Sequence, residues 1–491
     1  MHVAVDLGAD SGRVLAGRFD GERLTVTEAH RFPNQPIRGP HGALHTDARV
    51  LRAKVTEGIA RAAAQGEITS VGVDAWGNDF GLLDRDGRLL ADPRHHRDPY
   101  TSGLDSRVSS QEQYELTGVL PAPINTSCQL LAHAGSPLLE QAERLVMLPD
   151  LFTHWLSGQT LTERTIASTS QLMDIRAGQW AVELISALGL PGRLFGHEIV
   201  EPGTPAGPLR GCGDADGATV MAVAGHDTAC AVAALPAVRG DVGFICCGTW
   251  SLVGIERSDP VTLAAARHAG FTNEAGLAGT VRFLRNLNGL WLLQECRRAW
   301  GSRSSHAELV AQAASAPPFG PLIDPGHVAF LRPGDMPARI AGFCRATGQR
   351  PPGDRAATVR CVLESLACSF RRALEQAEHL GGRRVGAVHL VGGGAASPVL
   401  CRLTADFGGR PVLAGPVEAS GYGNLLIQVM AGGGIGTLAE LRDVVRRSSP
   451  PRVYEPDGTR GRYEEAYARY LRMTDIDVVW SKVAPNLSTE E

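Results

Sequence analysis

The chain repeats one local pattern, a strand, a glycine-centred turn and a second strand, and this repeat restricts its possible folds more than any other feature. Residues 3–8 and 13–19 predict strands on either side of a turn at residues 9–12, and residues 241–255 repeat the form. A strand rather than a helix follows Gly12, which indicates a β-hairpin and excludes a dinucleotide-binding turn. Successive N–H groups in such a turn can bind an anion. Two such hairpins predict a nucleotide held between two related domains; purely structural hairpins are the alternative.

The elements after the first hairpin follow the order of one half of an actin-like protein. Residues 24–32 predict a third strand, and residues 47–65 predict a helix with apolar residues at helical spacing. Residues 70–84 then give a strand, a polar turn and another strand. Three strands, a helix, a strand and a later helix form the β-β-β-α-β-α order. At 491 residues the chain is too long for one ordinary core, so we expect at least two domains.

A stretch in the middle of the chain is predicted to form the catalytic centre. An apolar strand over residues 219–224 stops at Gly225 and is followed directly by His226, Asp227 and Thr228. Polar side chains at the end of a strand are a common place for chemistry. The alternative is that Asp227 only caps the Ala-rich helix that begins next.

Three other segments are candidate ligand sites. Two acids and a tryptophan surround Gly77, which indicates a small polar ligand against an aromatic face, or else a tight turn. Residues 282–295 are expected to begin a helix that carries Asn286 and Gln294. The glycine turn of residues 392–394 is expected to lie against the adenine or ribose of a nucleotide, or to be a plain helix start.

Histidines and cysteines are expected to have structural roles. Because side chains alternate along an extended chain, the adjacent His95 and His96 should point to opposite sides. We therefore expect surface or substrate-loop residues there and no shared metal. The ten cysteines lack zinc spacing and predict free thiols. The neighbouring Cys246 and Cys247 are expected to pack beside a functional turn.

Charge and composition exclude several classes of function. A net charge of -4 gives no basic footprint for nucleic acid. No stretch approaches the roughly twenty apolar residues that a membrane span needs, so we expect a cytoplasmic protein without a membrane partner. A Walker-type phosphate loop requires a lysine in its glycine-rich turn, and lysine occurs only at Lys54 and Lys482. The sequence makes no prediction of an oligomeric state.

Taken in order, the motifs resemble those of the FGGY carbohydrate kinases. They are D-L-G-A-x-S-G-R from Asp6, G-V-D-x-W-G-x-D-F-G-L-L-D from Gly72, L-P-D from Leu148, H-D-T-A from His226, G-T-W-S-L-x-G from Gly248, L-x-N-x-x-G-L-W-L-L-Q from Leu284, V-G-G-G from Val391 and G-P-V-E-A-S-x-x-G-N from Gly415. The resemblance implies an α/β protein with two ribonuclease-H-like (actin-type ATPase) domains, residues 1–237 and 238–491. These domains would close over ATP, Mg²⁺ and a sugar, with a hinge around residues 235–240.

The resemblance also implies roles for single residues. Asp227 would be the general base. Because Mg²⁺ keeps several waters and uses few carboxylates, Asp6 is the candidate to hold it through water. The sugar would contact Gly77, His226, Asp227, Thr228 and Asn286. The nucleotide would contact Ala9, Asp10, Ser11, Gly12, Arg13, Thr249, Gln294, Gly393 and Gly394.

The implied reaction is ATP-dependent phosphorylation of a ketose hydroxyl, most closely the 1-hydroxyl of L-rhamnulose. L-Fuculose and L-xylulose are alternatives, because two sugar-facing positions depart from the family pattern: Asn78 stands where valine is usual, and His96 where tyrosine is usual. Asp10 and the Cys246-Cys247 pair also depart from it, each where the family has serine. These departures leave the expected reaction type unchanged.

Two other classes of function were weighed. An actin-like or chaperone-like ATPase would share both hairpins, but Trp76, Gly77 and Asn286 favour a sugar site. A hydrolase built on His226 and Asp227 would need a nucleophile, and the chain lacks the G-x-S-x-G elbow that presents a serine.

Overall fold

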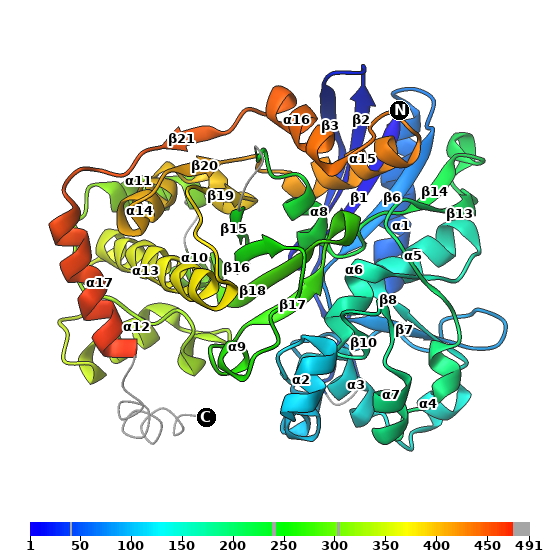
Figure 1. Ribbon diagram of the computed structural model, residues 1–491, viewed down its shortest axis with the longest axis horizontal. Coiled ribbons are helices and arrows are strands. Elements are labelled where there is room, and N and C mark those ends of the chain that lie inside the picture. Colours follow the sequence, from blue (N-terminus) through cyan, green and yellow to red (C-terminus); the bar gives the residue numbers. More distant parts are fainter. Residues whose placement is uncertain (40–41, 238–241, 302–304, 475–491) are drawn as a thin grey trace. The chain divides into compact units, whose positions relative to one another are not determined.

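The computed structural model describes residues 1–39, 42–237, 242–301 and 305–474 (Figure 1). The chain forms two compact units. The first comprises Met1–Gly240, Glu256–Leu284 and Glu418–Pro450, and the second comprises Asp241–Ile255, Arg285–Val417 and Pro451–Glu491. The predicted domain boundary after residue 237 adjoins a segment outside the described residues. Residues 238–240 of the predicted hinge lie within that segment. Both stay predictions.

The first unit is built on a six-stranded sheet of order β13-β14-β6-β1-β2-β3. Strand β1 (His2–Leu7) pairs antiparallel with β2 (Ser11–Phe19) and parallel with β6 (Ser70–Ala75), and β6 pairs parallel with β14 (Thr219–Ala222). The predicted hairpin is therefore confirmed. Parallel strands end at the same edge of a sheet, so polar residues that follow β1, β6 and β14 are brought together.

Helix α1 (Ala48–Ala63) covers one face of this sheet, and its sequence explains its bounds. The side chain of Asp47 accepts a hydrogen bond from the backbone N–H of Val50, which caps the first turn. Its buried residues recur at intervals of three and four, the spacing of one helical face. They are Ala48, Leu51, Val55, Gly58, Ile59 and Ala62.

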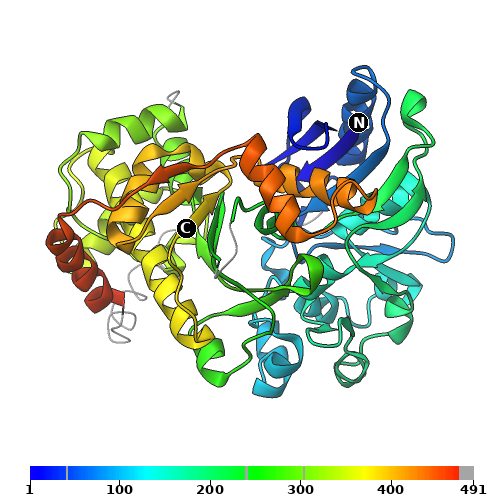
Figure 2. The same ribbon diagram turned by 45° about the horizontal axis from the view of Figure 1, so that its top comes forward.

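Two helices from the C-terminal part of the chain pack against the sheet of the first unit. Helices α15 (Ala419–Ala431) and α16 (Leu438–Ser448) lie beside β1–β3, and this holds in the turned view (Figures 1 and 2). Close approach requires glycine: a Cβ atom on Gly423 would lie 2.0 Å from the carbonyl oxygen of Cys230 on α8 (Asp227–Ala233). The C-terminal part of the chain thereby supplies residues to the sheet edge that carries the candidate site.

The remaining helices and strands of the first unit surround these elements. Its other strands are β3 (Leu24–Pro33), β4 (Ile37–Arg38), β5 (Leu44–His45), β7 (Phe80–Leu83), β8 (Arg144–Met147), β9 (Thr162–Glu163), β10 (Met173–Asp174), β11 (Gln179–Trp180), β12 (Ile199–Val200), β13 (Thr204–Pro208) and β17 (Thr272–Ala275). Its other helices are α2 (Gln111–Thr117), α3 (Thr126–Ala132), α4 (Pro137–Gln141), α5 (Leu148–Ser157), α6 (Arg164–Ala167), α7 (Val182–Ala187) and α9 (Ala264–His268).

The second unit contains the second predicted hairpin. Strand β15 (Gly243–Cys247) pairs antiparallel with β16 (Trp250–Arg257) and parallel with β19 (Val388–Val391). The sheet continues through β20 (Val412–Ala414) to β21 (Arg452–Tyr454). The turns that follow β15 and β19 therefore lie at the same sheet edge.

The predicted helix over residues 282–295 is wrong in its first half. Residues 281–288 form strand β18 (Val281–Asn288), whose first part pairs antiparallel with β17, with Thr272 opposite Leu284. A short apolar run is compatible with either element, and the neighbouring strand decides the outcome here. The helix starts later, as α10 (Trp291–Ala299), so Gln294 is helical as expected and Asn286 is not.

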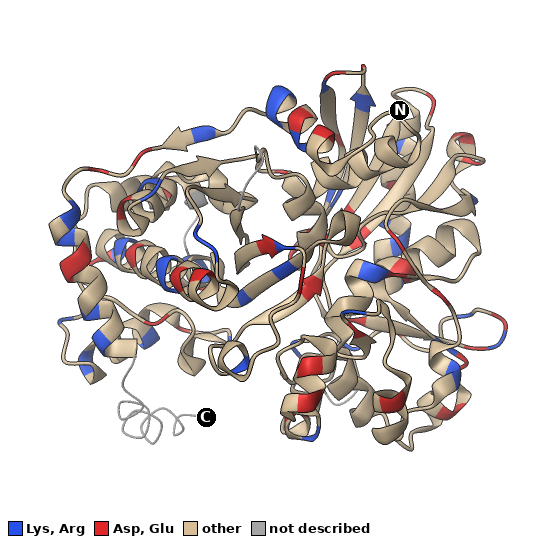
Figure 3. Ribbon diagram, in the orientation of Figure 1, with Lys and Arg blue, Asp and Glu red and all other residues tan. Residues whose placement is uncertain are grey.

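The other helices of the second unit are long and carry charges of both signs. Along α13 (Arg355–Gly381) the pairs Arg360–Glu364 and Arg371–Glu375 form ion pairs one turn apart, and Figure 3 shows the two signs interspersed there. The remaining helices are α11 (His306–Ala314), α12 (Met336–Ala346), α14 (Pro398–Gly408) and α17 (Arg460–Thr474).

Two expectations about the whole chain have been checked. Within the described ranges no helix combines the length and the apolar character that crossing a bilayer requires. All ten cysteines have free thiols, as predicted.

Candidate active site

Three carboxylates meet at one edge of the first unit's sheet. Asp6 on β1 lies opposite Asp74 on β6 in the parallel register. An isolated bridge then pairs Ala75 with His226, and this places Asp227 after β14 at the same edge. The strand-end position predicted for His226 and Asp227 is thus the observed one.

Asp227 is the first residue of α8 and does not cap it. The N-cap position belongs to His226, which makes no capping hydrogen bond, so the alternative of a purely capping Asp227 is wrong. The Asp227 carboxylate instead accepts a hydrogen bond from Thr228 Oγ1 at 3.0 Å, and His226 Nε2 lies 3.5 Å from Asp227 Oδ1. Burial raises the pKa of Asp227 and the Asp6 charge adds to this, while His226 opposes it. A carboxyl of raised pKa is suited to accepting a proton.

The other two carboxylates have partners from the late segment of the chain. Asp6 Oδ2 accepts a hydrogen bond from Ser420 Oγ at 2.5 Å and lies 3.0 Å from Arg13 Nη2. Asn424 Nδ2 donates to Asp74 Oδ2 at 2.6 Å. Burial raises the pKa of Asp74 well above its usual range, and the Asp6 charge adds to the effect. Asp74 therefore favours its protonated form.

Asp74, one of the two acids near Gly77, and its partner Asn424 were not predicted to be site residues. The signal was available, because Ser420 and Asn424 fall in the motif at residues 415–424 that supported the family resemblance. That motif also contains Glu418, which forms an ion pair with Arg13. Only the fold brings these residues to the edge that carries Asp6.

The first hairpin is held by its own packing. The N–H of Gly8 donates to the carbonyl of Ser11 at 3.1 Å, and Asn34 Nδ2 donates to the carbonyl of Gly8 at 2.8 Å. A Cβ atom on Gly12 would lie 2.2 Å from the ring of Phe32. Glycine is therefore required at residue 12 by packing. Ala9 and Asp10 lie in the turn directly before β2, the strand that carries Arg13.

A buried carboxylate fixes the backbone just before Asp227. Glu163 Oε2 accepts hydrogen bonds from the backbone N–H of Gly225 at 2.7 Å and of Ile166 at 3.1 Å, and from Thr165 Oγ1 at 2.6 Å. Thr165 Oγ1 in turn accepts from the N–H of His226 at 3.2 Å. On the other side, the carbonyl of Gly225 accepts from Ala75 N–H at 2.9 Å. Sequence analysis did not detect this role of Glu163, because it lies 62 residues from Gly225.

The turn after β6 contains a buried acid surrounded by donors. Asp79 accepts hydrogen bonds from Trp76 Nε1 at 2.8 Å and from Gln129 Nε2 at 3.4 Å, and His96 Nδ1 lies 3.3 Å away. Opposite charge on His96 lowers the pKa of Asp79 against the effect of burial. Asp79 is thus an ionised acid in an apolar setting and more than a turn residue.

The expectation that the side chains of His95 and His96 point to opposite sides is wrong. The rings of His95 and His96 are stacked, with centroids 4.3 Å apart, because the chain turns there instead of extending. Asp79, His95 and His96 offer ligand atoms within 4.8 Å of one another. However, His95 Nδ1 accepts a hydrogen bond from the N–H of Arg97 at 3.1 Å. A neutral imidazole has one lone pair, so His95 Nε2 carries a proton and is a donor rather than a metal ligand.

Asn78 has an unusual backbone conformation beside Gly77. Its φ of 73° lies in the left-handed region, which asparagine tolerates and β-branched residues do not. Its backbone is fixed, because its N–H donates to Thr169 Oγ1 at 3.2 Å and its carbonyl accepts from Thr126 Oγ1 at 2.7 Å. Its buried side-chain oxygen has no hydrogen-bond partner among the described residues. That oxygen therefore has unused capacity to accept a hydrogen bond.

In the second unit the predicted nucleotide residues converge. Gln294 Nε2 donates to Thr249 Oγ1 at 3.4 Å, and the carbonyl of Thr249 accepts from the N–H of Gly289 at 3.1 Å. A Cβ atom on Gly394 would lie 2.5 Å from Cys247 Sγ, and Gly393 faces the Cys247 carbonyl. The hairpin turn, the start of α10 and the glycine turn are thus adjacent. Asn286, an exposed residue of β18, belongs to the same unit.

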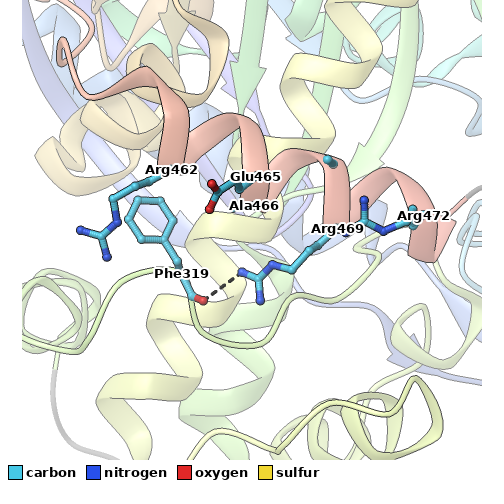
Figure 4. Close-up of a pocket in the computed structure, with 7 residues that line it drawn as sticks. Phe319, Arg462, Glu465, Ala466, Arg469 and Arg472 are labelled. Atoms are coloured by element: carbon cyan, nitrogen blue, oxygen red, sulfur yellow. Dashed lines mark hydrogen bonds between the residues drawn. The ribbon is translucent and has the colours of Figure 1, made fainter.

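Two surface cavities lie apart from these residues. One, of about 510 Å³, lies along α17, where Arg462, Arg469 and Arg472 extend from one face of the helix (Figure 4). Arg469 Nη2 donates to the carbonyl of Phe319 at 2.9 Å, and Arg462 stacks on the ring of Phe319. The other, of about 750 Å³, is lined partly by Arg52 and other residues of α1. None of the predicted site residues lines either cavity.

The sequence matches two family models over most of its length. The model described as the N-terminal domain of the FGGY family of carbohydrate kinases matches residues 1–232, and the model of the C-terminal domain matches residues 243–432. The chain belongs to the FGGY family of carbohydrate kinases. The ATPase without a sugar substrate and the hydrolase are therefore set aside, and the chain is a carbohydrate kinase.

Relatives in the FGGY family match nearly the whole chain. A rhamnulokinase of Bacteroides thetaiotaomicron is 40% identical over 95% of this chain and 98% of its own length. A rhamnulokinase of Enterococcus faecalis is 34% identical over 97% of this chain and 98% of its own length.

Solved structures of sugar kinases share the fold at low identity. A gluconate kinase from Lactobacillus acidophilus has a TM-score of 0.76 at 15% identity, covering 96% of this chain and 97% of that protein. A glycerol kinase from Plasmodium falciparum, solved with ADP, has a TM-score of 0.76 at 14% identity, covering 100% and 99%. The predicted actin-type α/β fold is confirmed.

Proposed function

We propose that this FGGY kinase transfers the terminal phosphoryl group of ATP to the primary 1-hydroxyl of L-rhamnulose. The observation that carries the proposal is the likeness to the Bacteroides rhamnulokinase, at 40% identity over 95% of this chain. The placement of Asp227 supports the same reaction, because a partly buried carboxyl of raised pKa lies at a sheet edge beside His226 and Thr228.

The chain's own residues divide the work. The carboxylate of Asp227 accepts the proton of the sugar's 1-hydroxyl while the oxygen of that hydroxyl forms a bond to the γ-phosphorus. The bond from that phosphorus to the bridging oxygen breaks, and ADP leaves. In phosphoryl transfer most of the acceleration comes from positioning and charge neutralisation. We assign the sugar to Gly77, His226, Thr228 and Asn286, and the phosphates to residues 9–13 and Thr249.

The side chains suit a magnesium ion. Asp6 offers a carboxylate beside the buried Asp74, and hard oxygen ligands are those that Mg²⁺ prefers. Asp6 would hold the ion through water, and the ion would neutralise charge on the phosphates. Arg13 and Ser420 already contact Asp6 Oδ2, which orients that carboxylate.

The adenosine part of ATP is assigned to the second unit. Gln294 and Thr249 are joined by a hydrogen bond, and the turn that contains the exposed Gly393 and the buried Gly394 lies beside Cys247. Glycine at such a turn permits close approach of a planar base or a ribose.

The test is an ADP-release assay on the purified protein with ATP and Mg²⁺. L-Rhamnulose, L-fuculose and L-xylulose are compared by kcat/KM, and a reaction without sugar is the baseline. We expect L-rhamnulose to give the highest value and a product phosphorylated at its primary carbon by NMR. A higher value for another ketose would refute the substrate, and equal ADP release without any sugar would refute the reaction.

A further inference from the structure

The imidazole of His226 lies between Asp227 and a buried ion pair that no sequence motif indicated. Its Nε2 is 3.5 Å from Asp227 Oδ1. On the opposite side of the ring, Nδ1 lies 3.2 Å from Glu274 Oε2 and within hydrogen-bonding distance of Arg282 Nη1, at 3.3 Å, and Nη2, at 3.2 Å. Glu274 and Arg282 are themselves paired at 3.0 Å.

The position of Arg282 is fixed. Its side chain is completely buried, and its Nε and Nη2 also donate to the carbonyl of Ala275 at 3.1 and 3.0 Å. Glu274 is its counter-charge. Burial raises the pKa of Glu274, but the charge of Arg282 and, after it, that of His226 lower this pKa below its usual value. The arginine fork therefore meets Nδ1 of His226 in a rigid geometry.

This contact selects the proton position on His226. A guanidinium has only donors, and Glu274 Oε2 has no hydrogen-bond partner among the described residues. The hydrogen bonds at Nδ1 are therefore those with Arg282, and they require its lone pair when the ring is neutral. The proton of the neutral ring then belongs to Nε2, the atom that faces Asp227. If Nδ1 takes a second proton, the new N–H can donate a hydrogen bond to Glu274, and Nε2 keeps its own N–H. The excluded state is the neutral ring with a bare Nε2 directed at the Asp227 carboxylate.

We propose that Glu274 and Arg282 are a positioning pair that fixes the tautomer of His226, so that Nε2–H is always directed at Asp227. His226 is then a permanent donor beside the base. The donor orients the Asp227 carboxylate and favours its ionised form, the form that can accept a proton from the sugar. This role rests on the proposed function, because it assigns the pair a part in that reaction.

Other titratable groups face the same place. Asp6 on β1 and Asp74 on β6 raise the pKa of neighbouring acids, and Glu163 and Cys230 lie close by. Of these groups, Asp6 raises the pKa of Asp227 through its charge and so disfavours the ionised carboxylate. Among the described residues around Asp227, His226 and the hydrogen bonds from Thr228 supply the opposing effect, with His226 the larger cause. We therefore expect the pair to influence the acid limb of the pH profile.

The test compares two buried ion pairs of the first unit. Glu274→Gln with Arg282→Met removes the positioning pair. The matched control is Glu256→Gln with Arg442→Met, which removes a similarly buried pair, 2.7 Å apart, on other elements. We expect the first double variant to lower kcat/KM for the ketose about 10- to 100-fold, as for loss of a hydrogen bond to a charged group. The control should stay within about threefold of wild type.

The pH profile separates positioning from simple loss of stability. With the pair removed, a bare Nε2 can face Asp227, which raises the pKa of that carboxyl. The acid limb of kcat/KM should then move to higher pH in the Glu274/Arg282 variant and stay in place in the Glu256/Arg442 control. Equal profiles in both variants would overturn the proposal.

A measurement without turnover keeps the proposal open to refutation if the variants fold poorly. Nitrogen-15 NMR of ring-labelled wild-type protein, with His226→Gln for assignment, reports which ring nitrogen carries the proton. We expect a protonated Nε2 at all pH values at which the protein is folded. A neutral ring with the proton on Nδ1 would overturn the inference, whereas absent ketose-dependent ADP release would refute only the proposed function.

Discussion

Gly394 lies directly on Cys247, so close that a Cβ atom at Gly394 would be 2.5 Å from the sulfur and 2.6 Å from the Cβ of Cys247. Cys247 is only 1% exposed and cannot move aside. This contact joins the glycine turn after β19 to the hairpin that carries Thr249. Cys247 therefore packs beside the glycine turn, and the function expected of that turn stays a prediction.

The contact gives a two-residue prediction. Gly394→Ala should lower the free energy of unfolding by about 1–3 kcal/mol, because it overpacks a closed site. Adding Cys247→Gly removes both the sulfur and the Cβ atom that the new side chain would meet, and should restore part of the loss. Urea unfolding of the wild type, both single variants and the double variant measures the coupling. A double variant no more stable than Gly394→Ala alone would argue against the contact.

Asp227→Asn tests the general base. The amide cannot accept the hydroxyl proton, so the ketose-dependent rate of ADP release should fall about 10²- to 10⁴-fold. Thermal stability should change little or increase, since an amide is less costly to bury than a carboxylate beside Asp6. A folded variant that keeps most of its ketose-dependent rate would exclude Asp227 as the base.

Asn78 is expected to contribute to the choice of sugar. Asn78→Gly removes the unpaired side-chain oxygen and suits the φ of 73°, so kcat/KM for the preferred ketose should fall about 10-fold or more without loss of stability. Asn78→Val should lower stability as well, because a β-branched residue is strained there. Asn78→Asp, which keeps an acceptor oxygen, is the control. Unchanged ketose preference in Asn78→Gly would show that the side chain does not meet the sugar.

His95 should make the protein sensitive to acid. Burial, and then the charge of His96, lowers the pKa of His95 to about 3 from its usual 6.5. The folded state therefore resists protonation of His95. The stability that the neutral ring contributes is complete above pH 6.5 and is lost as the pH falls toward 3. Within that window the loss reaches about 1.4 kcal/mol per pH unit. Denaturant unfolding at several pH values should give a shallower slope for His95→Gln, and an equal slope would contradict the assignment.

The sequence alone determined the elements whose signals are local. Each hairpin has its turn residues between two apolar strands, and α1 has its cap and its apolar face within sixteen residues. The motif series identified the family without any contact between distant segments. The position of His226 and Asp227 at a strand end also followed from a local pattern, an apolar strand that stops at a glycine.

Local signals failed where a neighbouring strand or a turn decided the outcome. Residues 281–288 have an apolar pattern compatible with a helix, and pairing with β17 makes them a strand. The adjacent histidines would diverge on an extended chain, but the chain turns and stacks their rings. Pairing with a neighbouring strand decides the first case, and the turn hydrogen bonds that Arg97 and Asp98 donate to His95 decide the second.

The environment of the candidate base was decided only by the tertiary structure. Asp74 owes its raised pKa to burial beside Asp6, and Ser420 and Asn424 reach these acids from more than three hundred residues away. The fork of Arg282 meets His226 across 56 residues. Hydrogen bonds and desolvation act over a few ångströms and depend on which groups the fold brings together, so residue types fixed the chemistry available, and the fold fixed the protonation state in which each group works.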